Sequence, residues 1–397
     1  MGEHARVRAA VALLGALVFW GAGASASAAT AASPAPRNGP TGNAFYMPRR
    51  VAPGRPGDVI WTSPIISPAG SRAWKVLYHS RGVDGRDVVV SGIVITPTAT
   101  APRGGWPVVT WAHGTEGLAD ACAASKALDI AYRIPGIQAF IKAGYAVVAT
   151  DYQGLGTPGR QPYLVGVSEA RGVLDIARAA HDMSAVHAST KVLVYGHSQG
   201  GQAALFAGQI APTYAPDLQL LGVAAVAPVS DLTALIPEAT ATPVALGYAV
   251  MAVVGFHAAY PSISLASVLT PQAVAGIGYL DQHCAADVID HYAEFTPGQI
   301  IAQSPLTVPT LAALLRQNTA GTVATPGPLF IAQGDRDELV PKPVTDQYVQ
   351  RACGVGDHLL YRVYPGQDHI GARDASVKDV QAWMAARVAG QPAPSTC

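Results

Sequence analysis

Short apolar runs and longer stretches with helical spacing alternate along this chain. Residues 106–112 and 145–150 are apolar at nearly every position, as expected for strands that are buried on both faces of a sheet. Residues 74–96 alternate between apolar and polar positions on either side of Asp84-Gly85, which predicts a β-hairpin. Similar patterns predict further strands at 192–195, 221–227, 329–333 and 359–364, and helices at 132–143, 168–186 and 377–388.

Strands that alternate with helices predict an α/β fold, in which a mostly parallel sheet carries helices on both faces. One segment interrupts the alternation. Residues 230–325 separate two predicted core strands, show helical patterns and are too long for a plain loop. We therefore expect residues 45–229 and 326–397 to form the α/β core and residues 230–325 to form a helical cap, or lid, over it. The alternative is an ordinary extra layer of helices.

The segment around Ser198 carries the clearest chemical signal and reads K-V-L-V-Y-G-H-S-Q-G-G-Q over residues 191–202. A β-branched and aromatic run ends at Gly196, and a helical pattern begins after Gly201. The pattern G-x-S-x-G between a strand and a helix is typical of the nucleophile elbow of α/β-hydrolases. Free N–H groups at the start of the helix favour a developing negative charge there. A surface turn that carries a serine by chance is the alternative.

A serine nucleophile needs a base and an acid, and in α/β-hydrolases the chain order is Ser, acid, His. The segment G-D-R-D-E-L-V-P offers Asp335 and Asp337, and the spacing G-x-x-D-x-x-V-P selects Asp337 as the catalytic acid. Asp335 is expected to brace the loop or to pair with Arg336. Among 11 histidines, His369 directly follows the last predicted strand, so we expect it at the same edge of the sheet as the catalytic base.

The oxyanion hole of such a site uses two backbone N–H groups. Gln199 follows the nucleophile and is expected to supply the first. The loop W-A-H-G-T-E-G is expected to supply the second from Thr115, with Glu116 as the alternative. His113 is expected to hold this loop by hydrogen bonding or packing.

Composition and the first residues limit the class of protein. The formal net charge is zero, only 13% of residues are charged and no basic run exists, so no nucleic-acid partner is expected. Two arginines, an apolar stretch and a run of small residues predict a secretory signal peptide in residues 1–28, cut near Ala26 or Ala28. A membrane anchor is the alternative. Residues 29–44 are expected to form a disordered start of the mature, exported chain.

Export and an even cysteine count predict two disulfides, and spacing does not choose among the three pairings that four cysteines allow. No cofactor and no metal are expected. A metal site at His283 and His291 is the alternative to a cystine beside a charged helix face. The glycines of residues 154–159 match a dinucleotide-binding pattern, but prolines interrupt the helix that such a site requires. The cysteines are Cys122, Cys284, Cys353 and Cys397.

Five segments, taken in order, resemble the secretory lipase family of α/β-hydrolases, which includes fungal lipase A enzymes and exported actinobacterial proteins. They read W-A-H-G-T, D-Y-Q-G-L-G, Y-G-H-S-Q-G-G, G-D-R-D-E-L-V-P and G-Q-D-H-I-G. The resemblance covers most of the chain from residue 74 onward. It implies that Ser198, Asp337 and His369 form a catalytic triad and that the insertion is a lid with an acyl tunnel.

The resemblance also implies the disulfides Cys122–Cys284 and Cys353–Cys397. This chain departs from the fungal members around Thr115, where those members carry an acidic loop.

The residues and the resemblance together predict an exported carboxylic ester hydrolase, a lipase or esterase that cleaves acyl esters such as triacylglycerols through an acyl-enzyme. Its expected partners are the acyl ester or lipid substrate and a lipid surface that meets the cap, and it is expected to be a monomer. A serine peptidase or an acyltransferase with the same triad is the first alternative. A non-catalytic exported binding protein on a hydrolase scaffold is the second.

Overall fold

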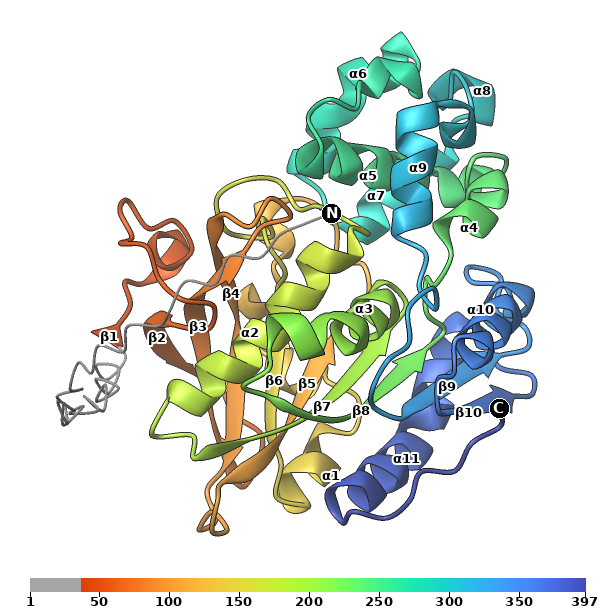
Figure 1. Cartoon of the computed structure of the whole chain (residues 1–397). Coiled ribbons are helices and arrows are strands. Elements are labelled where there is room, and N and C mark those ends of the chain that lie inside the picture. Colours follow the sequence, from red (N-terminus) through yellow and green to blue (C-terminus); the bar gives the residue numbers. More distant parts are fainter. Residues whose placement is uncertain (1–36) are drawn as a thin grey trace, which may run out of the picture. The chain divides into compact units, whose positions relative to one another are not determined.

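A ten-stranded sheet lies at the centre of the computed structural model, which describes residues 37–397 (Figure 1). The predicted signal peptide lies outside the described residues. The strands are β1 (Arg37–Asn38), β2 (Val59–Ile65), β3 (Ser71–Arg81), β4 (Asp87–Pro97), β5 (Trp106–Ala112), β6 (Ala146–Thr150), β7 (Ala188–His197), β8 (Gln219–Val226), β9 (Leu329–Gly334) and β10 (Leu359–Tyr364). The α-helices are α1 (Ile137–Lys142), α2 (Gly166–Asp182), α3 (Gln199–Tyr214), α4 (Leu232–Ala239), α5 (Pro243–Ala259), α6 (Pro271–Gly276), α7 (Ala285–Ala293), α8 (Pro297–Ile300), α9 (Pro309–Gln317), α10 (Lys342–Gly354) and α11 (His369–Val388).

The order of strands brings several loops to one edge of the sheet. The strands β6-β5-β7-β8-β9-β10 are neighbours in this order and run parallel, whereas β2, β3 and β4 are antiparallel. The carboxyl ends of parallel strands meet at the same edge, so the loops after β5, β7, β9 and β10 converge there. The mostly parallel sheet with helices on both faces confirms the predicted fold class.

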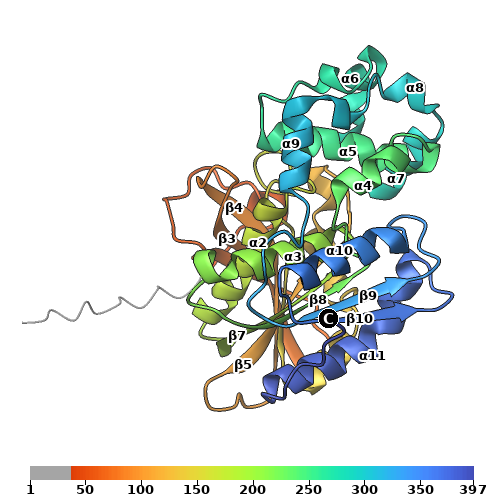
Figure 2. The same cartoon turned by 45° about the vertical axis from the view of Figure 1, so that its right-hand side comes forward.

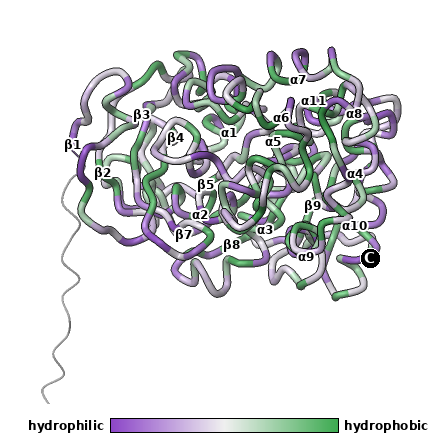
Figure 3. The backbone as a smooth tube through the Cα atoms, turned by 90° about the horizontal axis from the view of Figure 1, so that it is seen from above, coloured by the Kyte–Doolittle hydropathy of each residue, from purple (hydrophilic) through white to green (hydrophobic). Residues whose placement is uncertain are grey.

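Alternate side chains of each central strand pack into different layers. On β7, Val192 and Val194 belong to a core with α2, α3 and α10, whereas Leu193 and Tyr195 belong to a core with α1 and α11. This period of two is the geometry of a strand buried on both faces. In Figure 2, β9 and β10 lie between α10 and α11, and in Figure 3 the hydrophobic residues concentrate along the central elements.

The helices α4 to α9 connect β8 to β9 and share an apolar core with Leu118 and residues 163–165, and Leu246, Val250 and Val288 are fully buried in it. Figures 1 and 2 show these helices gathered at one end of the sheet. Asn318, which follows α9, connects them to the core: its side chain accepts from the N–H of Gly166 (2.8 Å) and its carbonyl accepts from the amide of Gln202 (3.0 Å). No helix within residues 37–397 is long and apolar enough to cross a bilayer.

Two disulfides fasten distant parts of the chain. Cys122 is bonded to Cys284 at the start of α7, and Cys353 in α10 is bonded to the last residue, Cys397. This is the pairing that the family resemblance implies. The N–H of Thr396 also donates to the carbonyl of Leu359 (2.7 Å), so the C-terminal tail lies against the start of β10.

The prediction of disorder up to residue 44 is wrong for its described part. Strand β1 pairs with β2, and Phe45 and Tyr46 are buried against Leu77 and Trp61. Small and polar residues led to the prediction of disorder, but the two aromatic rings that follow them bury enough apolar surface to anchor the segment.

The hydrophobic pattern of the sequence did not predict helix α10. Only a narrow set of its residues faces the sheet, with Val344, Tyr348 and Ala352 buried at every fourth position. The remaining positions are mostly polar, so the apolar stripe is too thin to stand out in the sequence.

Candidate active site

Ser198 lies on the turn between β7 and α3 with a backbone φ of 59° and ψ of −120°. A residue with a side chain is strained at such a φ. Gly196 and Gly200 make the turn sterically feasible, because a Cβ on Gly196 would collide with the carbonyl of Gly200 and a Cβ on Gly200 with that of Ala112. The N–H of Ser198 donates to the carbonyl of Val226 (3.0 Å). This is the strand, turn and helix that the sequence pattern predicts.

His369 and Asp337 form a buried pair. The Nδ1 of His369 lies 2.7 Å from Oδ2 of Asp337, whose side chain is 0% exposed. The other oxygen of Asp337 accepts from the N–H groups of Leu339 (3.0 Å) and Val340 (2.8 Å), and Oδ2 also accepts from the Gln333 amide (3.0 Å). Because the carboxylate accepts a hydrogen bond from Nδ1–H, the Nε2 of a neutral His369 carries no proton and can act as a base.

Asp335 forms a hydrogen bond within the loops rather than with His369, as expected. It is exposed, and its Oδ1 accepts from the N–H of Gly366 (2.6 Å). The N–H of Arg336 donates to the carbonyl of Gln367 (3.0 Å). Together these bonds hold the loop after β9 against the loop after β10, which carries His369.

Ser198 and His369 both line a cavity of about 490 Å³ at the carboxyl edge of the sheet. Among the described residues, no hydrogen bond joins the hydroxyl of Ser198 to the imidazole of His369. Catalytic hydrogen bonds are often long in the absence of substrate and shorten in the bound complex. The loops therefore bring all three predicted side chains to one site, with only the histidine–aspartate contact formed.

His197 positions the backbone of His369. Its Nε2 donates to the carbonyl of His369 (3.0 Å), and the two rings lie 4.6 Å apart between centroids. Burial, and then the proximity of His369, lowers the pKa of His197 to about 3. His197, which directly precedes Ser198, therefore contacts the start of α11 as a neutral imidazole.

The two residues predicted for the oxyanion hole lie next to Ser198. Gln199 is the first residue of α3, so its N–H has no partner within the helix. Thr115 lines the same cavity as Ser198, and its hydroxyl is 2.7 Å from the hydroxyl of Tyr163. The Glu116 carbonyl accepts from the N–H of Ala285 (2.9 Å), which ties this loop to α7.

His113 holds the same loop by hydrogen bonding, which confirms its expected role. Its Nδ1 donates to the carbonyl of Gly114 (2.7 Å), while its own carbonyl accepts from the hydroxyl of Tyr152 (2.9 Å).

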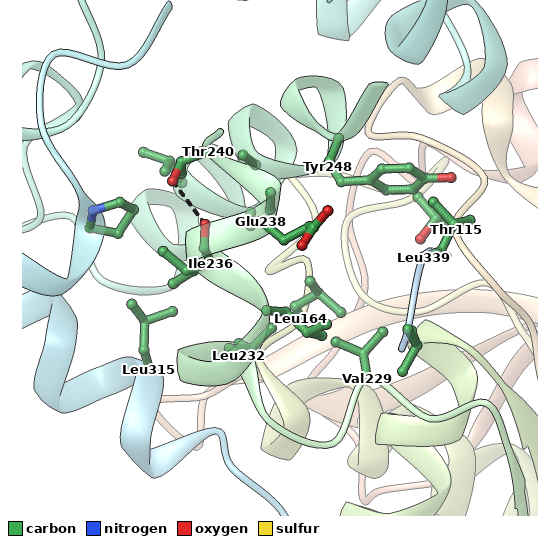
Figure 4. Close-up of a pocket in the computed structure, with 18 of the residues that line it drawn as sticks. Thr115, Leu164, Val229, Leu232, Ile236, Glu238, Thr240, Tyr248, Leu315 and Leu339 are labelled. Carbon is green, nitrogen blue, oxygen red and sulfur yellow. Dashed lines mark hydrogen bonds between the residues drawn. The ribbon is translucent and has the colours of Figure 1, made fainter. Parts of the chain in front are cut away.

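A second cavity, of about 540 Å³, also reaches Ser198 and is lined mainly by apolar side chains of α4, α5 and α9 (Figure 4). Leu232 and Ile236 contribute from α4, and Leu315 contributes from α9. We call this space the apolar cavity and the space beside His369 the polar cavity. Ser198 and Thr115 line both, so the serine lies where the two cavities meet.

Glu169, on the first turn of α2, is a residue that the sequence analysis did not single out. It is 1% exposed, and its Oε1 accepts from the amide of Gln199 (2.7 Å) and from the N–H of Leu164 (3.0 Å). Burial raises its pKa to about 8. Leu164 has a strained φ of 59° and lines the apolar cavity. No local sequence signal distinguishes Glu169 from a surface acid near a helix start.

His283, His291 and the glycines of residues 154–159 are the residues of the alternative sites considered above. His283 and His291 stack on either side of Tyr279, with ring centroids 3.7 Å and 4.1 Å away. Residues 37–397 contain no cluster of His, Cys, Asp and Glu side chains suited to a metal ion. The glycines of residues 154–159 precede a turn, and α2 begins only at Gly166, so no helix opens at them as a dinucleotide site requires.

The burial of Glu169 predicts a pH dependence of stability. The folded chain keeps the proton of Glu169 up to about pH 8, whereas an unfolded chain loses it near pH 4. The folded state therefore binds the additional proton between these values, and the free energy of unfolding should fall as the pH rises through this window. In Glu169→Gln this fall should be absent. Urea unfolding at several pH values measures it.

The matched control is Glu294→Gln, which removes an exposed carboxyl from the end of α7 and should keep the wild-type slope. An equal slope in Glu169→Gln and the wild type would contradict the prediction.

Comparison with known proteins identifies the family. A family model described as secretory lipase matches residues 122–396. The secreted triacylglycerol lipase LIP4 of Malassezia globosa is 27% identical over 353 residues, which cover 82% of this chain and 74% of that protein. A protein of Mycobacterium tuberculosis, named a probable inactive lipase, is 24% identical over 378 residues, which cover 89% of this chain and 83% of that protein.

Solved structures show the same fold. The structure of Candida antarctica lipase A superposes with a TM-score of 0.74 at 18% identity, covering 87% of this chain and 84% of that chain. A rice cell wall degrading esterase, LipA of Xanthomonas oryzae, superposes with a TM-score of 0.71 at 18% identity, covering 85% of this chain and 100% of that chain. These likenesses establish the α/β-hydrolase fold, and the match to the family model over most of the chain shows that this protein belongs to the secretory lipase family.

Proposed function

We propose that the protein is an exported carboxylic ester hydrolase that cleaves acyl esters of lipids, with Ser198 as nucleophile, His369 as base and Asp337 as the acid that orients it. The observation that carries the proposal is the position of Ser198 in the lining of both cavities. An ester has an acyl part and an alcohol part on either side of the carbonyl carbon. A nucleophile between an apolar and a polar space can hold both parts at once.

The chemistry follows from the hydrogen bonds of His369. Its Nε2 takes the proton of Ser198 as the hydroxyl oxygen attacks the acyl carbon, and Asp337 stabilises the imidazolium through Nδ1. The N–H groups of Gln199 and Thr115 stabilise the oxyanion. His369 then protonates the leaving alcohol, and water attacks the acyl-serine to release the carboxylic acid.

The cap helices support a lipid substrate. We infer that the acyl chain occupies the apolar cavity beneath α4 and α5, with residues 230–325 as the lid. Val244 and Leu339 line this cavity and are 60% and 39% exposed, so its mouth presents apolar side chains to solvent. Such side chains suit contact with a lipid surface.

Export completes the proposal. Secreted relatives, two disulfides and the sequence of residues 1–28 support a cleaved signal peptide. Mass measurement of the protein secreted into the culture medium of an expressing cell tests this cleavage. A secreted chain that still begins at residue 1 would contradict it.

Two other functions compete with ester hydrolysis. A peptidase or an acyltransferase could use the same side chains, and one relative is named a probable inactive lipase. A fluorophosphonate probe that labels the wild type but not Ser198→Ala would exclude an inert scaffold.

Substrate preference separates a hydrolase of esters from a peptidase. We expect faster turnover of p-nitrophenyl and triglyceride esters than of aminoacyl anilides, because the apolar cavity is lined mainly by apolar side chains that suit an acyl chain better than a peptide backbone. Comparison of kcat/KM across this panel measures the preference. Faster anilide turnover would reverse the proposal, and transfer of the acyl group to an added alcohol in preference to water would indicate an acyltransferase.

Replacement of the nucleophile should remove nearly all turnover. Ser198→Ala is expected to lower kcat by about a million-fold with KM little changed, because the attacking oxygen is lost while the cavities remain. Steady-state kinetics on a soluble ester measures this loss. A variant that keeps a tenth of the wild-type rate would show that another group attacks the substrate.

The two neighbouring aspartates should differ in their importance. Asp337→Asn is expected to lower kcat by about ten-thousand-fold, because an amide stabilises the wrong tautomer of His369. Asp335→Asn keeps a side-chain oxygen that can accept from the N–H of Gly366 and should cost far less. Parallel kinetics on the two variants provide the test, and the reverse order would identify Asp335 as the acid.

A further inference from the structure

Among residues 37–397, the charged side chains that line the apolar cavity are all acidic. Glu238 and Glu338 contribute carboxylates, and no lysine, arginine or histidine of this part of the chain is present in the lining. The polar cavity differs, because it includes Arg133 and Arg373 as well as acidic groups. A molecule that enters the apolar cavity therefore meets mainly apolar side chains, and the charges that it meets are negative.

Glu238 lies in the last turn of α4 and makes no ion pair or side-chain hydrogen bond with any described residue. A negative charge at the carboxyl end of a helix opposes the helix dipole, so this position gives α4 no electrostatic benefit. Glu238 therefore contributes a carboxylate to the cavity without serving the stability of its own helix.

The direction of the side chain supports the same view. In Figure 4, Glu238 extends from α4 into the space between Leu164 and Tyr248, with its carboxylate directed toward the side of the cavity where Thr115 lies. Glu338 is exposed on the loop after β9, next to Asp337, whereas Glu238 lies on α4 itself. Of the two carboxylates, Glu238 is thus the one that an acyl chain beneath α4 would pass.

We propose that Glu238 makes the apolar cavity select esters by charge, so that it accepts neutral acyl groups and acyl groups with a cationic substituent, and excludes acyl groups that end in a carboxylate. This proposal rests on the proposed function, in which the acyl chain occupies the apolar cavity. Glu238 is a specificity-determining residue here and takes no part in bond making.

The physical basis is the cost of bringing like charges together with little water between them. An acyl carboxylate in the cavity would lose hydration to the apolar wall and would also be repelled by Glu238. Glu238 is itself exposed, so the solvent screens part of this repulsion. A methyl-ended chain has no charge to be repelled and binds through apolar contacts alone, and an ammonium group gains an attractive partner.

Three p-nitrophenyl esters of one acyl length, ending in a methyl, a carboxylate or an ammonium group, test the proposal on the full-length mature protein. In the wild type, we expect kcat/KM to be about tenfold lower for the carboxylate ester than for the methyl ester, and equal or higher for the ammonium ester. In Glu238→Gln both differences should shrink to about twofold or less, and in Glu238→Lys the preference should reverse. The ratio of kcat/KM for each charged ester to kcat/KM for the methyl ester is compared within each variant, so a change in overall turnover does not affect the comparison.

The matched control is Glu338→Gln, which removes the other carboxylate and should retain most of the discrimination. Raising the ionic strength from about 0.01 M to about 1 M should also weaken the discrimination of the wild type, because salt screens the repulsion.

Each outcome bears on a separate statement. Normal turnover of the methyl ester with an unchanged carboxylate-to-methyl ratio in Glu238→Gln would overturn the charge selection and leave the proposed function intact. If the discrimination is lost in Glu338→Gln but not in Glu238→Gln, it depends on Glu338 and not on Glu238. This result would also overturn the proposal. A wild type that hydrolyses none of the three esters would overturn the proposed function and this inference with it.

Discussion

The backbone of Ser198 is the constraint on which the rest of the site depends. Its left-handed conformation persists because β5, β7 and α3 approach so closely that Gly196 and Gly200 have no room for a side chain. The turn directs the serine away from the sheet, at the level where the loops after β9 and β10 bring Asp337 and His369. Loss of this close packing would release the strain and move the hydroxyl away from both cavities.

Buried polar groups around this turn fall into two kinds. Asp337 accepts hydrogen bonds at both of its oxygens from backbone and side-chain N–H groups, so its environment suits a carboxylate that must face an imidazole. Among the described residues, Glu169 has partners at one oxygen only, and burial raises its pKa. A carboxyl that keeps its proton places no negative charge beside the side-chain amide of Gln199, the residue whose backbone N–H is proposed for the oxyanion hole.

Under the proposed function, the helices α4 to α9 form the cap, and the cap and the core both contribute to recognition. In that proposal the core supplies the reacting groups from loops at one edge of the sheet, and the helices between β8 and β9 supply most of the wall of the apolar cavity. The cap is joined to the core by the Cys122–Cys284 bond and by the hydrogen bonds of Asn318. Members of one fold can therefore change the shape and charge of the substrate space by changing the insertion, while the edge of the sheet stays the same.

The sequence by itself predicted most strands of the sheet and several of the helices around it, the serine turn, the preference for Asp337 and the choice of His369, because each depends on local patterns and on the rule that parallel strands end at one edge. It did not determine the anchoring of residues 37–46, strand β2, helix α10, the buried acid Glu169 or the acidic lining of the apolar cavity. Those features arise from the tertiary arrangement, as in the contact of Glu169 with Gln199 and in the direction of Glu238 into the cavity. Only the tertiary structure decides which side chains lose their water and which charges face one another, and no local pattern records that.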